Sequence, residues 1–224
     1  GAVVGIRVAN DVTIAAGGGI DADGLGFTPT GSNKNGSGAG QTSSSGGGYG
    51  GRGGGTGGGA VYGRADMPLA PGSPGGWYAY STGLRAGQGG GAIRLLAGGD
   101  IHLNGTLSAN AMPKEPSYGG TGASGGAIFV AARRLTGDGL MRANGALNFS
   151  LTNADGGGGR IAVWVGLPLA TVEVRIATAG AGPLRLDAYA PFADGSFEVL
   201  RASDAAQDGT AGIYGLAGTV LLVR

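Results

Sequence analysis

The side chains that most often carry catalysis are scarce in this chain of 224 residues. It has a single histidine, His102, and no cysteine. Alternation along Ile101-His102-Leu103 turns His102 away from the apolar side chains beside it, so we interpret it as an exposed surface residue. One histidine without cysteine provides almost no material for a zinc site or for a Ser-His-Asp or Cys-His nucleophile.

Carboxylates are the next candidates, because a glycosidase needs two of them beside the scissile bond. Glutamate occurs only at Glu115, Glu173 and Glu198. Asp21 and Asp23 stand two residues apart in a turn, where aspartate commonly hydrogen-bonds the local backbone. The sequence therefore predicts no catalytic residue, and we expect that the protein is not an enzyme.

Calcium is the only cofactor that the sequence brings into consideration. Neither an EF-hand loop nor a Gly-Gly-x-Gly-x-Asp repeat is present, so no metal site is predicted. The aspartates that would serve such a site best are Asp21, Asp23, Asp138 and Asp155.

The distribution of charged and apolar residues argues against binding to nucleic acid and against a membrane span. A net charge of +1 without a basic cluster argues against nucleic-acid binding. No apolar run reaches the roughly 18 residues needed to span a bilayer, so no membrane span is predicted. Gly1 does not begin a basic-then-apolar leader, and we expect any export signal to have been removed or to lie outside the sequence.

Aromatic residues beside glycine tracts admit two interpretations. Trp77, Tyr78 and Tyr80 could form a platform on which sugar rings stack, and we name them as possible glycan contacts. The alternative is that aromatic rings in such segments cover bare backbone and anchor loops.

Glycine dominates the composition, with 54 residues, yet the mean hydropathy is positive. Eleven of the fourteen residues from 46 to 59 are glycine. Such a tract can be a flexible linker. It can also be an ordered segment in which backbones approach closely because side chains are missing. Glycine pairs recur directly before apolar strand segments, which favours order.

An internal repeat underlies the glycine. Four units combine short strands of period two with Gly, Asn or Asp turns, and a partial fifth unit spans residues 218–223. One face of the leading strands is expected to carry Ile6, Val8, Ile93, Leu95, Ile128, Val130, Ile161 and Val163. The opposite face is expected to carry Arg7, Arg94, Phe129, Arg160 and Trp164. No segment shows a capped helical stripe, and Val172–Ile176 is predicted as a strand.

Stacking of these units would bury the apolar faces that each unit leaves open. We therefore predict an all-β fold, a parallel β-solenoid (β-helix-like) with glycine-rich insertions that form polyglycine-type ordered loops. A single domain would span 1–224, with a glycine-rich insertion at about 31–90. A peripheral strand segment at about 178–212 would form a hairpin or an intersubunit element.

Several of these segments resemble glycine-rich β-helix-like modules of large bacterial secreted and cell-surface proteins. The resemblance rests on residues 47–55, 60–63, 89–95, 103–110, 156–163 and 216–220. It implies a non-catalytic module in an extracellular or cell-surface setting, and it implies no catalytic residue.

Both ends of the chain are apolar and strand-like, and neither shows a polar cap. Unpaired edge strands invite strand addition by another chain. We therefore expect a structural subunit of an extracellular filament or surface layer that assembles head-to-tail with copies of itself. The predicted interface comprises Val3, Val4, Ile6, Val8, Val220, Leu221, Leu222 and Val223. The alternative is an adhesin or glycan-binding module that contacts polysaccharide or other cell-surface components.

Overall fold

The structure is a computed structural model. The residues that it describes are 1–29, 36–76, 79–80, 83–84, 86–113, 120–148, 153–186 and 190–215.

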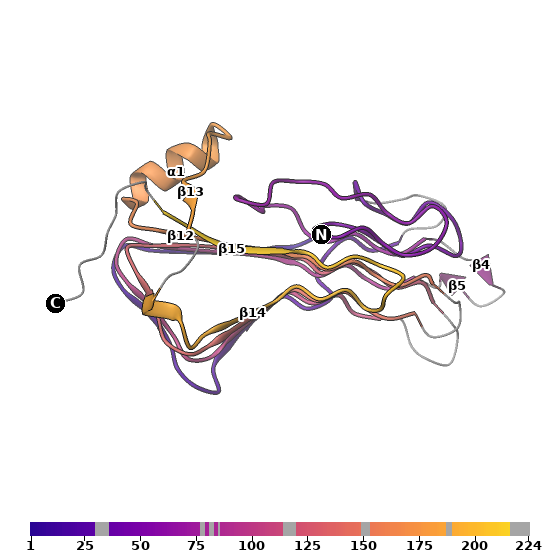
Figure 1. Cartoon of the computed structure of the whole chain (residues 1–224), viewed down its shortest axis with the longest axis horizontal. Coiled ribbons are helices and arrows are strands. Elements are labelled where there is room, and N and C mark those ends of the chain that lie inside the picture. Colours follow the sequence, from indigo (N-terminus) through magenta and orange to yellow (C-terminus); the bar gives the residue numbers. More distant parts are fainter. Residues whose placement is uncertain are drawn as a thin grey trace.

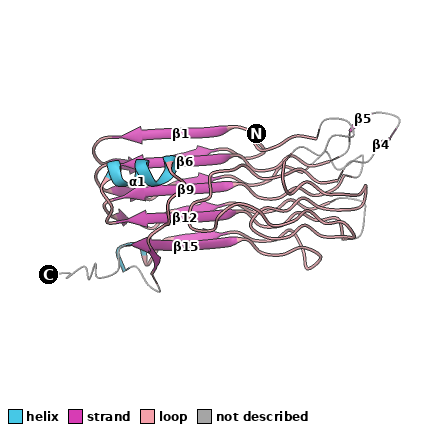
Figure 2. Cartoon of the chain, turned by 90° about the horizontal axis from the view of Figure 1, so that it is seen from above, coloured by secondary structure: helices cyan, strands magenta, loops and turns pink. Residues whose placement is uncertain are grey.

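Three sheets of mainly parallel strands form one half of the molecule (Figures 1 and 2). The large sheet has the order β1 (Val3–Val8), β6 (Ala92–Ala97), β9 (Ala127–Ala132), β12 (Arg160–Val165), β15 (Thr210–Gly215) and β13 (Leu184–Arg185). The second sheet has the order β10 (Leu135–Thr136), β7 (Ile101–Leu103) and β2 (Val12–Ile14). The third sheet has the order β14 (Ser196–Glu198), β11 (Leu140–Arg142), β8 (Thr106–Ser108) and β3 (Gly19–Asp21). A separate antiparallel pair joins β4 (Ala79–Tyr80) to β5 (Gly83–Leu84).

The register of the large sheet stacks like residues on one another. Ile93 lies opposite Ile128, which lies opposite Ile161, and two positions later Leu95, Val130 and Val163 form a second row. These side chains are buried together with Leu103, Leu107 and Met141 of the other two sheets, in one core enclosed by the three sheets. The predicted inward row is therefore confirmed for β6, β9 and β12. In β1, at the edge of the sheet, Ile6 and Val8 are half-buried.

The opposite face of the large sheet is covered by other parts of the chain. Phe129 and Trp164 are fully buried and meet edge to face, with their ring centres 5.1 Å apart. Met67 and Val172 pack over them in a second apolar cluster. Sequence alternation placed Phe129 and Trp164 on this face correctly, but it did not show that the face would be buried.

One of the covering elements is a helix, α1 (Leu169–Ala177), which lies over the large sheet in Figure 2. The predicted strand at Val172–Ile176 is wrong. Pro168 is the residue before the helix, and its carbonyl oxygen accepts from the amides of Thr171 (2.9 Å) and Val172 (3.1 Å) in the first turn. Leu169, Val172 and Ile176 share one helical face and pack on the second cluster, so tertiary burial prevails over the weak strand preference of the valines.

The other half of the molecule consists of glycine-rich segments that are buried and hydrogen-bonded. Three successive amides donate to carbonyl oxygens of three different segments. They are Gly46 to Gly54 (2.8 Å), Gly47 to Gly122 (3.0 Å) and Gly48 to Gly38 (2.8 Å). Successive donors that point to three neighbours are typical of extended backbone with about three residues per turn. The linker interpretation is therefore wrong for this tract.

Close backbone approach explains why glycine is required in these segments. A Cβ on Gly156 would lie against the carbonyl of Ala123, and one on Gly59 would lie against the carbonyl of Gly38, both far inside van der Waals contact. Backbone atoms cannot move aside as the end of a flexible side chain can, so each extra methyl group would separate whole segments.

The prediction of an all-β parallel β-solenoid is wrong. The described chain forms an α/β-like arrangement of three sheets with a helix on the large one, and that sheet is mixed because β13 runs antiparallel to β15. The sheets do not close clearly into a solenoid, because glycine-rich backbone fills the second half of the molecule, with hydrogen bonds that diverge to several neighbours.

The segment at about 178–212 also differs from its prediction. β13 pairs with β15 in the large sheet, whereas β14 pairs with β11 in the third sheet, so they do not form a hairpin with each other. A short 3₁₀ helix, η2 (Ala190–Phe192), lies between them and contacts β10. The fifth strand of the large sheet is β15, which sequence reasoning missed because Gly212 and Gly215 interrupt its apolar pattern.

Candidate functional site

The predicted N-terminal interface residues lie on β1, at the edge of the large sheet (Figure 2). Val4 and Ile6 are half-buried and pack against the main core, while the side chain of Val3 is 48% exposed. β1 pairs with β6 on one side, and no described strand pairs with it on the other.

Hydrogen bonds show which backbone groups of β1 face away from the sheet. The carbonyl oxygens of Ala2 and Val8 accept from the amides of Ala92 (3.1 Å) and Gly98 (2.9 Å) on the β6 side. In a parallel pair, alternate residues direct their N–H and C=O groups to the same neighbour. The N–H and C=O groups of Val3, Gly5 and Arg7 therefore point to the open side.

The other two sheets end in open edges at the same end of the molecule. In β2, the amide of Val12 donates to Asp100 O (2.9 Å) and Ile14 O accepts from Asn104 (2.9 Å), which leaves the backbone of Thr13 facing outward. In the third sheet, the same reasoning from Gly18 and Ala22 leaves Gly19 and Asp21 facing outward. Within the described residues, three parallel edges thus form one surface, the open edge of β1, β2 and β3.

Few of the usual devices protect this open edge. Proline is absent from β1, β2 and β3, and a Cβ on Gly5 would have no atom within 4 Å. Arg7 pairs with Glu173 of α1, and the Arg7 guanidinium lowers the pKa of that carboxyl below its ordinary value through their hydrogen bond. This surface ion pair connects the edge strand to the helix.

The opposite end of the large sheet is partly closed. β13 lies antiparallel along the end of β15, opposite Tyr214 and Gly215, and the Leu186 amide donates to Ile213 O at 2.8 Å. The other predicted interface residues, Val220, Leu221, Leu222 and Val223, lie outside the described residues. The two ends are therefore different surfaces.

The predicted glycan contacts cannot be placed as a site. Trp77 and Tyr78 lie outside the described residues, and only the backbone of Tyr80, in β4, is described. Two other tyrosines of the glycine-rich segments are anchors. The rings of Tyr49 and Tyr62 lie 4.6 Å apart, and the hydroxyl of Tyr62 donates to Pro71 O at 2.5 Å. Burial raises the pKa of Tyr62 to about 12, so its hydroxyl stays protonated.

A buried arginine secures the same tyrosines to the large sheet. Arg160 is 4% exposed and donates to Tyr62 O at 3.0 Å and to Thr210 Oγ1 at 2.9 Å. Its guanidinium lies 5.5 Å from the centre of the Tyr49 ring. Burial lowers the pKa of Arg160 below its ordinary value. Cationic, aromatic and carbonyl groups together hold the glycine-rich insertion in place.

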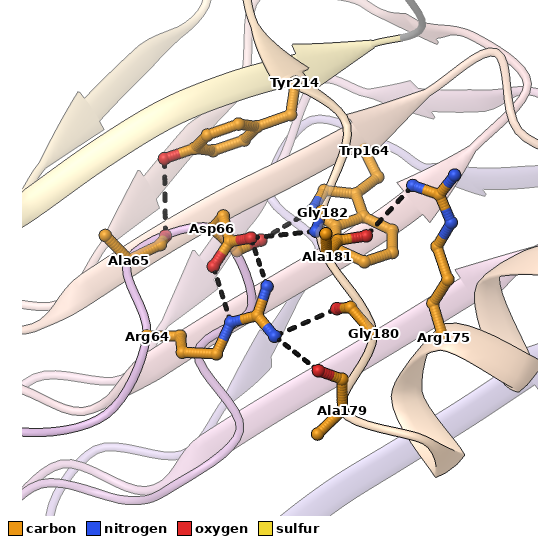
Figure 3. Close-up of polar contacts among 10 residues, drawn as sticks. All are labelled: Arg64, Ala65, Asp66, Trp164, Arg175, Ala179, Gly180, Ala181, Gly182 and Tyr214. Carbon is orange, nitrogen blue, oxygen red and sulfur yellow. Dashed lines mark hydrogen bonds and ion pairs between the residues drawn. The ribbon is translucent and has the colours of Figure 1, made fainter.

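A second brace joins the insertion to the helix (Figure 3). Arg64 forms a two-pronged contact with Asp66, through Nε–Oδ1 (2.9 Å) and Nη2–Oδ2 (2.5 Å). Its Nη1 donates to Ala179 O (2.8 Å) and Gly180 O (2.9 Å), just beyond α1. Trp164 Nε1 donates to Asp66 O at 2.6 Å. The Arg64 guanidinium lowers the pKa of Asp66, so this carboxylate stays ionised at neutral pH.

The residues considered for acid–base or metal chemistry make local polar contacts. His102 is exposed, as predicted, and its ring nitrogens contact Thr136 Oγ1 and the Asn104 side chain, both at 2.9 Å. Asp21 accepts from the Asp23 amide at 2.7 Å, which confirms the predicted turn bond. Within the described residues, no group of three His, Cys, Asp or Glu side chains could hold a metal ion.

A polar row crosses the outer face of the third sheet. Asp21, Ser108, Arg142 and Glu198 lie opposite one another in register. A shallow groove of about 330 Å³ opens at the β3 end of this row, lined by Gly17, Gly18, Gly19, Ile20, Asp21, Thr106, Ser108 and Arg142. Sequence reasoning did not find it, although alternation in β8 and β11 would place Thr106, Ser108 and Arg142 outward.

The fold and these surfaces define a β-rich protein with an open sheet edge and a small polar groove. No family model matches the chain, and neither a curated protein nor a solved structure is significantly similar to it. In the described part of the chain, no helix combines the length and apolar character needed to cross a membrane.

Proposed function

We propose that this protein is a structural subunit of an extracellular filament or surface layer, and that it assembles with copies of itself through its terminal strands. The observation that carries the proposal is the open edge of β1, β2 and β3, where three sheets leave backbone donors and acceptors without a described partner. Such edges are templates for the addition of a strand.

The side chains at the open edge favour association as well. Val4, Ile6, Val12 and Ile20 are only half-buried although they pack on the main core. A strand or a second sheet end placed on the edge would complete their burial, and each such side chain contributes about 1.5–3 kcal/mol when it is fully buried. Backbone pairing and apolar burial therefore act in the same direction.

The proposed partner surface is at the other terminus of a second copy. The segment Gly218–Val223 ends in the apolar, strand-forming run Val220-Leu221-Leu222-Val223, and only Leu216 and Ala217 separate it from β15 in the sequence. β13 partly covers the large sheet at that end, so two flat sheet ends cannot meet there directly. We therefore favour a contact in which the terminal segment of one copy adds to the open edge of the next. A contact between different surfaces that does not close into a ring generates an open filament.

The substitution Gly5→Pro tests the open edge. It removes an outward N–H group and leaves the bonds of β1 to β6 intact, because the Gly5 backbone faces the open side. We expect the purified protein to form filaments that are visible by negative-stain electron microscopy. Gly5→Pro should form none under the same conditions, and the concentration at which it associates, measured by sedimentation, should be at least about tenfold higher than for the parent. Gly5→Ala, which keeps the N–H group, should assemble as the parent does.

Two outcomes would contradict this proposal. One is a parent protein that stays monomeric at every concentration tested, and the other is a folded Gly5→Pro variant that still assembles. Deletion of residues 217–224 separates the two surfaces: loss of filaments with a folded monomer supports the terminal segment as the donor. Unchanged filaments would assign the contact to another part of the chain.

A further inference from the structure

The groove on the third sheet is bordered by side chains that are already held in place. Asp23 accepts from Ser108 Oγ and from the Asn110 amide, both at 2.6 Å, and Ser108 Oγ accepts from Arg142 Nε at 3.0 Å. This relay from Asp23 through Ser108 fixes the position of the Arg142 guanidinium. A preorganised donor loses less conformational entropy when a ligand binds.

Three polar groups in the groove keep hydrogen-bonding capacity within the described residues. The terminal nitrogens of Arg142 have no described partner, and neither does the hydroxyl of Thr106. One carboxylate oxygen of Asp21 accepts from the Asp23 amide, while the other has no described partner. The groove therefore presents donors, an acceptor and a group that can act as either.

The charges around the groove argue against an anionic ligand. Arg142 brings one positive charge, but Asp21 lies in the same row and Glu198 stands next to Arg142 in register. Asp23 adds a further negative charge directly behind Ser108. A neutral ligand that offers hydroxyl groups suits this arrangement better, because each hydroxyl can donate to Asp21 or accept from Arg142.

We propose that this groove binds one neutral hexose unit of a polysaccharide. The volume of about 330 Å³ accommodates a single ring, near the lower end of the size range of ligand pockets. The glycines at 17–19 leave one wall without side chains, so the ring can approach the backbone. The site is separate from the predicted aromatic contacts. It borders the open edge through Gly19, Ile20 and Asp21 of β3, while Thr106 and Arg142 lie on the outer face of the third sheet.

The affinity of this site for a single sugar should be weak. The lining contains no aromatic ring on which the sugar could stack, and the groove is shallow, so we expect a Kd of about 1 mM or weaker for a monosaccharide. Copies linked in an assembly would bind a polysaccharide more tightly through avidity, without any new contact.

Saturation-transfer NMR with glucose and galactose as neutral probes, and with glucuronate as the anionic probe, tests the assignment. We expect a neutral hexose to bind the parent protein and Arg142→Gln to weaken binding by at least about tenfold, because a hydrogen bond from a charged group is lost. Asp21→Asn and Thr106→Val should each weaken it less. Arg201→Gln removes an exposed guanidinium elsewhere and should bind as the parent does.

Three results would overturn the proposal. They are the absence of binding by both neutral sugars, equal binding by the parent and Arg142→Gln, and tighter binding of glucuronate than of either hexose. The last result would make the groove an anion site. Because Gly5→Pro leaves the groove unchanged, sugar binding by that variant separates this proposal from the one on assembly.

Discussion

The two halves of this molecule are held together by opposite means. In the strand half, branched apolar side chains such as Ile93, Ile128 and Ile161 stack in rows between the sheets. In the glycine-rich half, segments such as 46–59 and 156–159 lie backbone against backbone, and their amides donate directly to neighbouring carbonyls. Side-chain burial supplies the free energy in the first half, and backbone hydrogen bonding organises the second.

The difference predicts opposite sensitivities to a change of one carbon atom. A core of side chains can relax when a methylene group is removed, because rotamers and neighbours adjust. Backbones in direct contact have no such freedom, so an added methyl group must move a whole segment. The glycine-rich half should therefore be the less tolerant of the two, although it has almost no side chains.

The largest expected effect is that of Gly156→Ala. The new Cβ would meet the carbonyl of Ala123 far inside van der Waals contact, in a segment where both neighbours are buried. We expect the free energy of unfolding to fall by about 3 kcal/mol or more, or the variant to fail to fold. Urea unfolding followed by circular dichroism measures the change.

Gly5→Ala is the matched control for this substitution. Its Cβ would have no atom within 4 Å, and we expect a change within about 0.5 kcal/mol. If the two alanine variants were equally stable, the backbone packing described for the glycine-rich half would be incorrect.

A medium effect is expected for the removal of one carbon from the strand half. Ile128→Val shortens a fully buried side chain in the middle of the stacked row, and it should cost about 0.5–1.5 kcal/mol. The same urea titration gives the comparison directly. A loss greater than that caused by Gly156→Ala would reverse the proposed order of tolerance.

The smallest expected loss from breaking a contact concerns the brace between the insertion and the helix. Asp66→Asn removes the charge that Arg64 pairs with and keeps an oxygen for the Gly182 amide, so we expect a loss of about 0.5 kcal/mol at pH 7. Because the pKa of Asp66 is lowered in the folded protein, its stabilising contribution is present above the ordinary value near 3.8 and is lost as the pH falls through the lowered value.

The difference in stability between the parent and Asp66→Asn should therefore be constant from about pH 5 to 8 and should shrink below about pH 4. Thermal unfolding across that range checks the prediction. A difference that persists unchanged in acid would show that the variant acts through a change in packing and not through the charge.

The alternation of apolar and polar residues was sufficient to predict one part of the fold. It correctly assigned Ile93, Leu95, Ile128 and Val130 to the buried face, because side chains on a strand alternate whatever the strand's neighbours are. It also located β1 and the turn bond between Asp21 and Asp23. These features depend on residues close together in the sequence.

The predictions that failed depended on distant segments. The residues of α1 alternate as in a strand, and only burial against Met67 and Trp164, remote in the sequence, favours the helix. The local sequence likewise does not indicate that β13 pairs antiparallel with β15. Nor does it indicate that β14 belongs to a different sheet from β13. The groove on the third sheet combines residues from β3, β8 and β11, which no single segment displays.

The sequence by itself thus determined the buried faces of β6, β9 and β12, because the alternation of side chains depends only on the local backbone. Only the tertiary structure decided which faces are covered, which edges stay open and how the sheets end. Those outcomes depend on contacts between segments 30 or more residues apart, such as Arg64 with Gly180 and Arg160 with Tyr62. A local pattern does not encode the partners in such contacts.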